Sequence, residues 1–246
     1  MPAFFIPSRQ VHDGRVVVTG ELLNHLRGSL RVRPNEEVRL TTDTGRRYRV
    51  RITEVTRGEL HAEVLDERAR PERRAPSLTL GQAVLKGDRM DWVIQKATEL
   101  GVGSITPLIC ARGIVRPLAA RTRSQQSRWQ RIALEAAQQA ERWDVPVLGA
   151  PCEAWDWLAT PPTSTMKLIL AERGSGESLS TLALPREPGH HIVIAVGPEG
   201  GWEQEEVTQA LRGGFLTITL GERILRSETA GLAALSIIQS RLGELG

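Results

Sequence analysis

The sequence is poor in cysteine and in aromatic residues. Its 246 residues include two cysteines, and phenylalanine, tryptophan and tyrosine together make up only 4%. Cys110 and Cys152 are too few for the disulfide framework of a small secreted domain, and with five scattered histidines they match no zinc-ligand spacing. We therefore expect a cytoplasmic protein, kept in a reducing compartment and without a metal site.

Long apolar runs are missing as well. No stretch approaches the ~18 apolar residues of a membrane-spanning helix, and the N-terminal MPAFFIPSRQ lacks the basic start and long apolar core of a signal peptide. Hydrophobic residues nevertheless make up 40% of the chain and charged residues 25%. These proportions exclude a disordered chain and predict one large or two smaller globular domains.

Positive charge is concentrated in the N-terminal third. Residues 1–76 contain 15 arginines, no lysine and 11 acidic residues, a net charge of +4, whereas residues 77–246 contain 17 basic and 18 acidic residues, a net charge of −1. Arginine binds phosphate through a bidentate fork and stacks on bases. The excess favours a nucleic-acid partner and is equally compatible with an ordinary solvated surface.

The first 70 residues predict a small antiparallel barrel or sheet. Tyr48, Val50 and Ile52 alternate with arginines, which is typical of a half-buried strand. A turn is predicted at 43–45 and one helical turn at 21–26. Segment 67–76, with two prolines and four arginines, is interpreted as a linker. The strands are predicted at 15–19, 36–42, 47–55 and 59–65.

After the linker, strands alternate with helices. Apolar residues at helical spacing predict helices over 90–97, 129–140 and 230–242. Near-continuous apolar strands between helices predict a mostly parallel sheet covered on both faces, in which ligands bind beyond the carboxyl ends of the strands. The strands are predicted at 78–85, 104–109, 145–148, 167–171, 191–196 and 215–220.

Three segments that follow predicted strands contain glycine. They are Gly197-Pro198-Glu199-Gly200-Gly201-Trp202, the stretch 221–231, and Glu172-Arg173-Gly174-Ser175-Gly176. None matches the dinucleotide fingerprint or the phosphate-binding P-loop. Glycine permits close approach of a ligand to the backbone, and Ser227 is a suitable N-cap for the last helix. The first two segments are predicted to form one pocket, with plain connecting turns as the alternative.

These segments carry a family resemblance. VGPEGGWEQEEV (196–207) followed by LGERILRSETAGLAAL (220–235) resembles the SPOUT superfamily of RNA methyltransferases, and within it the RsmE-type enzymes, which methylate uridine N3 in small-subunit ribosomal RNA. The resemblance extends to 25–38, 86–108 and 128–148 and so spans nearly the whole chain. The chain departs from the pattern at Pro34-Asn35, where glycine is expected, and at Ser227, where threonine is common.

The resemblance implies an α/β protein with two domains. Residues 1–70 would form a PUA-like RNA-binding β-barrel, and residues 77–246 a SPOUT-type methyltransferase domain with a C-terminal trefoil knot. It also implies S-adenosyl-L-methionine as cofactor, 16S ribosomal RNA or the small ribosomal subunit as partner, and a homodimer. Periodicity does not predict the knot, because knots are rare in proteins.

Individual roles follow from the same resemblance. Arg226 is expected to stabilise the uracil anion or to contact a phosphate, with a surface ion pair to Glu228 as the alternative. The expected RNA contacts are Arg9, Arg31, Arg33, Lys86 and Arg142, each of which could instead be a surface cation. The expected cofactor contacts are Leu170, Glu172, Gly197, Glu199, Gly200, Leu220, Gly221, Ile224, Leu225 and Thr229.

Other functions are less compatible with the sequence. A nicotinamide-dependent oxidoreductase needs a glycine fingerprint after the first strand, where this chain has Leu85-Lys86-Gly87-Asp88. A non-catalytic RNA-binding protein would not need the intact loops at 197–201 and 220–229. An RNA methyltransferase that acts on another base or on ribose remains an alternative. No general base is identified, and His190-His191, at the start of a strand, are expected to be structural.

Overall fold

The computed structural model describes residues 3–114, 119–171 and 176–246 and divides into two compact units. The first unit consists of Met1–Glu72 and Ala137–Asp144, and the second of Arg73–Ala136 and Val145–Gly246. Each unit has its own hydrophobic core, as expected for separate globular domains.

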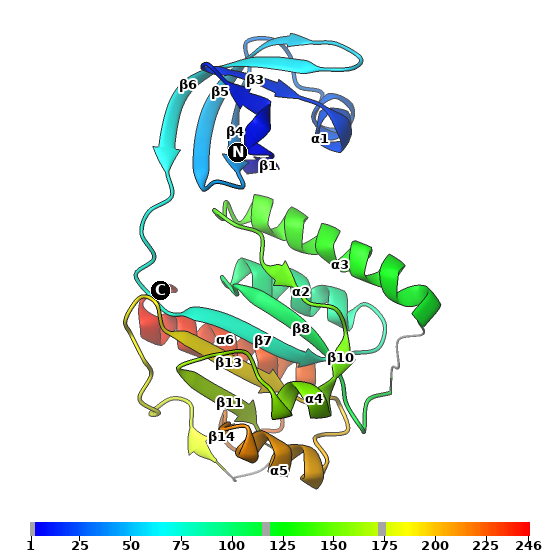
Figure 1. Cartoon of the computed structure of the whole chain (residues 1–246), viewed down its shortest axis with the longest axis vertical. Coiled ribbons are helices and arrows are strands. Elements are labelled where there is room, and N and C mark those ends of the chain that lie inside the picture. Colours follow the sequence, from blue (N-terminus) through cyan, green and yellow to red (C-terminus); the bar gives the residue numbers. More distant parts are fainter. Residues whose placement is uncertain (1–2, 115–118, 172–175) are drawn as a thin grey trace. The chain divides into compact units, whose positions relative to one another are not determined.

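The first unit is built on a six-stranded sheet (Figure 1). Its strands lie in the order β1-β4-β5-β6-β3-β2, and all neighbours are antiparallel except β1 and β4. The predicted strands and helical turn are confirmed, whereas β1 and β2 were not predicted. The elements are β1 (Ala3–Ile6), η1 (Ser8–Gln10), β2 (Val11–His12), β3 (Arg15–Val18), α1 (Gly20–Asn24), the π-helical turn η2 (His25–Ser29), β4 (Glu37–Thr42), β5 (Arg46–Val55) and β6 (Leu60–Ala69).

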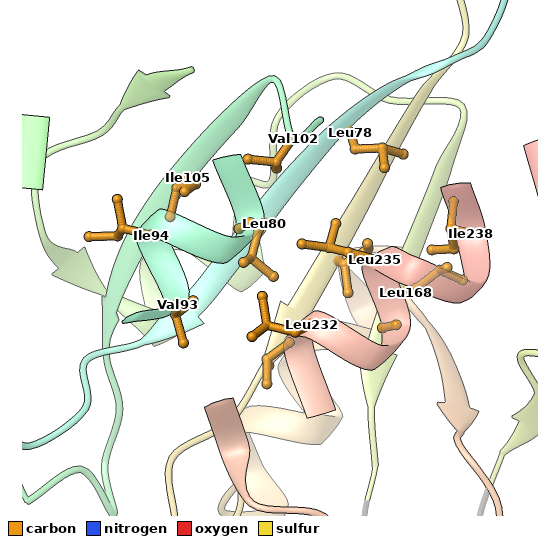
Figure 2. Packing of buried hydrophobic residues seen from close by; sticks show 14 of the residues in the cluster. Leu78, Leu80, Val93, Ile94, Val102, Ile105, Leu168, Leu232, Leu235 and Ile238 are labelled. Atoms are coloured by element: carbon orange, nitrogen blue, oxygen red, sulfur yellow. The ribbon is translucent and has the colours of Figure 1, made fainter. Parts of the chain in front are cut away.

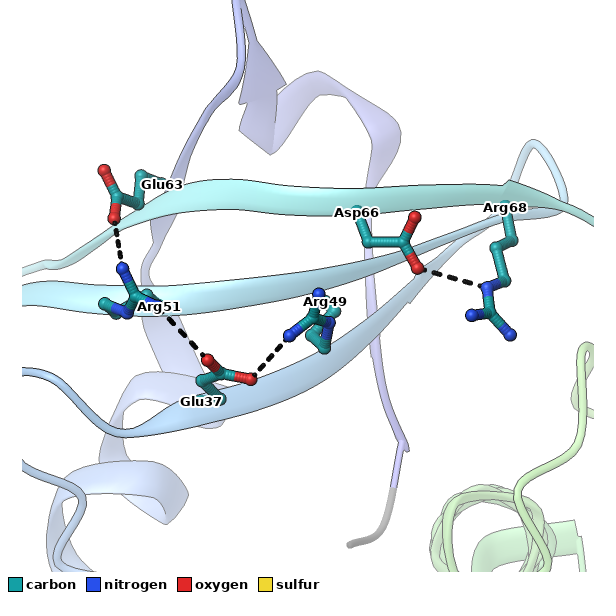
Figure 3. Close-up of polar contacts among 6 residues, drawn as sticks. All are labelled: Glu37, Arg49, Arg51, Glu63, Asp66 and Arg68. Atoms are coloured by element: carbon teal, nitrogen blue, oxygen red, sulfur yellow. Dashed lines mark hydrogen bonds and ion pairs between the residues drawn. The ribbon is translucent and has the colours of Figure 1, made fainter.

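The alternation along β5 separates a core face from a charged face. Tyr48, Val50 and Ile52 are buried together with residues such as Phe4, Leu40 and Leu60. The intervening arginines pair across strands, as Figure 3 shows. Glu37 of β4 accepts hydrogen bonds from Arg49 (3.1 Å) and Arg51 (3.4 Å), and Arg51 also donates to Glu63 of β6 (3.3 Å). These two arginines are therefore paired within the sheet, while the net charge of +4 of residues 1–76 is unchanged.

Two details of the first unit differ from expectation. The predicted linker begins too early, because β6 continues through Glu67–Ala69, which stay paired with β5, and Arg46 forms an ion pair with Glu67. Asn35, where the family pattern has glycine, lies in the left-handed region at φ +73°. Asparagine tolerates this conformation better than most residues, so it can occupy a position at which glycine was expected.

The second unit contains a parallel sheet in the order β10-β8-β7-β13-β11-β14-β12, with β9 beside β8. All six predicted strands are present, whereas the two-residue strands β10 and β12 and helix α4 were not predicted. The strands are β7 (Ser77–Ala83), β8 (Ser104–Ile109), β9 (Val147–Leu148), β10 (Cys152–Glu153), β11 (Met166–Leu170), β12 (Glu177–Ser178), β13 (His191–Val196) and β14 (Leu216–Thr219). The helices are α2 (Arg89–Glu99), α3 (Ala119–Gln139), α4 (Ala154–Ala159), α5 (Gln204–Arg212) and α6 (Ser227–Leu242).

Helices cover both faces of this sheet. Along β13, Ile192, Ile194 and Val196 enter the cluster that contains α2 and α6, whereas Val193 and Ala195 enter the cluster that contains α4 and α5. Figure 2 shows the first cluster, where Leu232 and Leu235 of α6 pack near residues of β7 and α2. Two buried faces explain the near-continuous apolar strands. None of the described helices is long and apolar enough to cross a membrane.

Candidate functional site

A cavity of about 740 Å³ lies at the carboxyl ends of β11, β13 and β14, within the size range of small-molecule sites. Because these strands are neighbours and parallel, the segments that follow them meet at one edge of the sheet. The lining consists of Leu170, Ala171, Ser178, Val196, Gly197, Pro198, Glu199, Gly201, Trp202, Thr219, Leu220, Gly221, Glu222, Arg223, Ile224, Leu225, Arg226, Ser227 and Ala230.

Trp202 shapes the loop that follows β13. Its indole is largely buried, and Nε1 donates a 3.1 Å hydrogen bond to the carbonyl oxygen of Leu170 at the end of β11. A Cβ on Gly197 would lie 3.0 Å from the indole atoms Cε2 and Nε1. Gly197 lines the cavity, but the close neighbour that a side chain at this position would meet is Trp202.

Ser227 connects this loop to the start of α6. Its hydroxyl donates a 2.5 Å hydrogen bond to the carbonyl oxygen of Gly197 and accepts a 2.9 Å hydrogen bond from Nε2 of the fully buried Gln82 on β7. The predicted N-cap role of Ser227 is wrong by one residue: the N-cap is Arg226, in an extended conformation, and Ser227 is the first residue of the helix. The hydroxyl instead bonds to Gly197, which follows β13, and to Gln82 on β7.

Buried and half-buried carboxylates surround the same edge. Glu206 of α5 is buried, and it accepts hydrogen bonds from the backbone N–H groups of Glu203 (2.9 Å) and Ala111 (3.0 Å). Glu199 lines the cavity and accepts a 2.8 Å hydrogen bond from Nη1 of Arg89 at the start of α2. These contacts fix the start of α5 and the side chain of Glu199.

Arg226 is exposed at the cavity wall. The alternative interpretation, an ion pair with Glu228, does not hold, because the cation nearest to Glu228 among the described residues is Arg89, with Nε 3.8 Å from Oε1. No ion pair of Arg226 occurs within the ranges that the structure describes. Its guanidinium therefore remains accessible to a ligand.

Comparison with known proteins identifies the family. A family model described as "RNA methyltransferase domain" matches residues 72–239, and one described as "RNA methyltransferase PUA domain" matches residues 18–65. The chain belongs to this RNA methyltransferase family. Its fold is accordingly a PUA-like domain together with a parallel-sheet methyltransferase domain.

Relatives within the RNA methyltransferase family align over most of the chain. Ribosomal RNA small subunit methyltransferase E of Mesomycoplasma hyopneumoniae is 31% identical over 96% of this chain and 98% of its own length; the protein of that name from Synechocystis sp. is 29% identical over 96% and 77%. The crystal structure of ribosomal RNA small subunit methyltransferase E from Neisseria gonorrhoeae bound to S-adenosyl methionine is 36% identical, covers 98% of both chains and has a TM-score of 0.86.

A second solved structure supports the same assignment. The protein Lpg2936 from Legionella pneumophila, in complex with the bound cofactor SAM, is 29% identical to this chain; the match covers 97% of both chains and has a TM-score of 0.86. These two solved structures match 97% and 98% of this chain, so the similarity includes residues of both compact units.

The structure brings most of the predicted cofactor residues together. The seven that line the cavity are Leu170, Gly197, Glu199, Leu220, Gly221, Ile224 and Leu225. Gly200 and Thr229 do not line it: a Cβ on Gly200 would lie 3.2 Å from Cβ of Arg112, and Thr229 is exposed on the first turn of α6. Glu172 lies outside the described residues. Contact of the seven with a cofactor stays a prediction.

Sequence reasoning missed several lining residues. Trp202 is part of the motif that carried the resemblance, and its position beside two glycines indicated a close packing partner. Arg223 precedes Ile224 and Leu225, which are expected cofactor contacts, but nothing in the sequence placed Arg223 itself at a cavity. Ser178 belongs to the two-residue strand β12, which is too short to produce a recognisable pattern.

The predicted RNA contacts divide into two groups. Arg9, Arg31, Arg33 and Lys86 are exposed. The side chain of Arg142 is only 10% exposed and donates a 2.8 Å hydrogen bond to Asp144. Burial tends to raise the pKa of Asp144, but hydrogen bonds and charge from Arg142 and Arg70 outweigh it and hold that pKa below its ordinary value. The ion pair and the low exposure fit a structural role for Arg142, and its contact with RNA stays a prediction.

The contacts of His191 lie outside the cavity lining. His191 lies at the start of β13, with Nε2 2.7 Å from the hydroxyl of Thr79 and Nδ1 2.9 Å from the carbonyl oxygen of Thr163. The contacts of His191 agree with its expected structural role, and the role of His190 stays a prediction. Within the described parts of the chain, no group of three or more histidine, cysteine, aspartate or glutamate side chains could hold a metal ion.

Proposed function

We propose that this protein transfers the methyl group of S-adenosyl-L-methionine to N3 of a uridine in 16S ribosomal RNA. The observation that carries the proposal is the cavity beyond β11, β13 and β14, in a chain that aligns over 98% of its length with a relative bound to S-adenosyl methionine. Relatives named ribosomal RNA small subunit methyltransferase E support the choice of RNA.

The lining of the cavity is compatible with this cofactor. Leu170, Leu220 and Leu225 offer apolar cover for an adenine ring, and backbone groups near Gly197 and Gly221 are accessible to polar atoms. Glu199 places a carboxylate at the wall, where it would favour a sulfonium cation. The cofactor supplies an electrophilic methyl group, and the protein's part is to hold it in line with the base.

Arg226 is the proposed catalytic residue. Uracil N3 must lose its proton before it attacks the methyl carbon, and the negative charge then spreads onto the ring oxygens. An accessible guanidinium at the cavity wall would stabilise that charge or a neighbouring phosphate. Because Arg226 precedes the first turn of α6, its backbone is anchored by a regular helix, which supports a fixed position for the cation.

The remaining predictions complete the proposal. Residues 1–70 would bind RNA, with Arg9, Arg31, Arg33 and Lys86 as phosphate contacts that position the substrate without reading its sequence. Residues 77–246 would carry the cofactor site and a C-terminal trefoil knot. The active form would be a cytoplasmic homodimer acting on 16S ribosomal RNA or on the small ribosomal subunit. The family description of the N-terminal match, a PUA domain, supports the division of roles.

Mass spectrometry of nucleosides tests the reaction directly. Ribosomal RNA, free or within small subunits, would be incubated with the protein and methyl-labelled cofactor and then digested. We expect labelled 3-methyluridine. Label on another base or on ribose would indicate a different RNA methyltransferase activity. Calorimetric titration with S-adenosylmethionine is the companion measurement. If the cofactor binds but no label appears in the RNA, the protein is a non-catalytic RNA-binding protein. If the cofactor does not bind, the cavity is not the cofactor site.

A further inference from the structure

Three charged side chains form a group at the cavity, in which Arg89 contacts both Glu199 and Glu228. Arg89 lies at the start of α2, Glu199 in the loop after β13 and Glu228 in the first turn of α6. Nη1 of Arg89 lies 2.8 Å from Oε1 of Glu199, and Nε of Arg89 lies 3.8 Å from Oε1 of Glu228. Of the three, Glu199 alone forms part of the cavity wall.

Glu228 is the unusual member of this group. Its side chain is only 11% exposed, and its buried Oε2 atom has no hydrogen-bond partner among the residues that the structure describes. A buried carboxylate is costly unless it is paired and fully hydrogen-bonded, and an unpartnered buried oxygen in a folded protein calls for an explanation. Packing alone would be served by an uncharged residue, so the negative charge of Glu228 indicates a function.

The charges of the group do not balance. Arg89 is the single cation that contacts either carboxylate within the described residues, and it is shared between the two. Two carboxylates and one guanidinium give this group a net charge of −1. The cavity wall also carries Glu222, Arg223 and Arg226, whose charges are the same in every variant compared below. With side-chain exposures of 21% for Glu199 and 11% for Glu228, the charge of the group is less screened than it would be on an open surface.

We propose that Arg89, Glu199 and Glu228 make the cavity prefer the positively charged methyl donor over the spent product. The inference rests on the proposed function. In methyl transfer the N3 lone pair forms the new N–C bond, while the electron pair of the breaking S–C bond stays on sulfur. The sulfonium thereby becomes a neutral thioether, and S-adenosylhomocysteine differs from the donor in both the methyl group and the charge. Because the donor carries one positive charge more than the product, the negative charge of this group favours the donor.

The proposal predicts opposite signs for two substitutions. Glu228→Gln keeps the shape but leaves one carboxylate and one guanidinium, so the ratio of donor affinity to product affinity should fall about fivefold. Arg89→Met leaves two uncompensated carboxylates, so the ratio should rise by a similar factor. Arg89→Lys keeps the charge and should leave the ratio close to that of the wild type. A purely structural role would weaken both ligands alike.

Calorimetric titration of the full-length protein with S-adenosylmethionine and S-adenosylhomocysteine tests this inference at low and moderate salt. Lys96→Met is the matched control, since Lys96 lies on the same helix, pairs with Glu99, and neither residue lines the cavity. We expect its ratio to equal that of the wild type, and the effects of Glu228→Gln and Arg89→Met to shrink as salt increases.

The outcomes are distinguishable. Equal changes for both ligands in Glu228→Gln, or a fall of the ratio in Arg89→Met, would overturn the charge-selection proposal while the proposed function stands. Failure of the wild type to bind either ligand would instead remove the proposed function. If Arg89→Met does not fold, as judged by its thermal unfolding, Glu228→Gln and Arg89→Lys decide the question, because both are close in shape to the native side chains.

Discussion

The hydroxyl of Ser227 and the carbonyl oxygen of Gly197 lie 2.5 Å apart and join the start of α6 to the end of β13. Because Nε2 of Gln82 donates to the same hydroxyl from β7, three elements are fixed together beside the cavity. The two loops that the sequence predicts as one pocket are thus connected by a buried side-chain network, and movement of either would disturb the other.

Ser227→Ala should loosen this connection. The buried amide of Gln82 and the carbonyl of Gly197 would each lose a partner, at a cost of about 1–3 kcal/mol in stability. We expect weaker cofactor binding, by about tenfold if ~1.4 kcal/mol of that cost falls on the bound form. Ser227→Thr retains the hydroxyl and should bind nearly as the wild type does. Calorimetric titration and urea unfolding measure both quantities.

Ser236→Ala is the control for this prediction. The Ser236 hydroxyl donates to the carbonyl oxygen of Leu232 within the same helix, so its removal deletes a serine hydroxyl from α6 without touching the cavity segments. If Ser227→Ala binds the cofactor as tightly as Ser236→Ala does, the network does not position the site.

Gly197→Ala should act through Trp202. The added methyl group would lie 3.0 Å from the indole, closer than side chains normally approach, so the ring must move and its hydrogen bond to Leu170 would weaken. We expect loss of stability of about 1–3 kcal/mol, altered tryptophan fluorescence and weaker cofactor binding. Gly58→Ala, where a Cβ meets no atom within 4 Å, should change none of these. Unaltered fluorescence in Gly197→Ala would contradict the packing argument.

Cys110 should make the protein less stable in alkali. Burial, reinforced by nearby carboxylates, raises the pKa of the Cys110 thiol far above its ordinary value, so the folded protein keeps a proton that the unfolded chain releases near pH ~8.5. Stability from this group is complete below that pH and is lost above it, by up to about 1.4 kcal/mol per pH unit. Burial also raises the pKa of Cys152, with the same sign.

Urea unfolding between pH 7.5 and 9.5 measures this effect. Cys110→Ala should flatten the decline of unfolding free energy with pH, and Cys152→Ala, at a half-buried position, should flatten it less. Other alkaline groups contribute equally to all three proteins. Identical slopes for Cys110→Ala and the wild type would show that the thiol ionises alike in the folded and unfolded states.

The spacing of apolar residues predicted those elements of the fold in which buried residues follow a regular pattern along the chain. The alternation through Tyr48, Val50 and Ile52 predicted a strand with one buried face, and the apolar run 191–196 predicted a strand buried on both faces. Parallel strands then placed the loops after β13 and β14 at one edge, where the cavity lies. These inferences need only the neighbours along the chain and the geometry of a sheet.

Features that depend on distant partners were not predictable in this way. Serine is a residue type that is common at N-caps. The hydroxyl of Ser227 nevertheless bonds to Gly197 and Gln82, which are 30 and 145 residues away in sequence. Arg142 was expected on an RNA surface, whereas its side chain is only 10% exposed and pairs with Asp144, which also binds Arg70, 74 residues away from Asp144 in sequence. The unpartnered oxygen of Glu228 likewise becomes visible only when the packing around it is known.

Arg226→Ala tests the proposed catalytic residue. Arg226 lines the cavity, has no ion-pair partner among the described residues, and stands beside a site proposed for a cationic cofactor. Such a cation is unfavourable for the cofactor unless an anion also enters, and deprotonated uracil or its phosphate would be that anion. Turnover should therefore fall by about 10²–10³-fold, the scale of one preorganised charge stabiliser, while cofactor affinity stays equal or improves slightly.

Two further variants make this prediction specific. Arg226→Lys should recover only part of the turnover, because an ammonium group lacks the planar fork that grips two oxygens at once. Arg212→Ala removes an exposed arginine from the last turn of α5, outside the cavity, and should methylate RNA as the wild type does. Single-turnover methylation and calorimetry separate the two effects. If Arg226→Ala keeps wild-type turnover, another group must stabilise the uracil anion. Arg223, the other arginine at the described cavity wall, would then be the next residue to substitute.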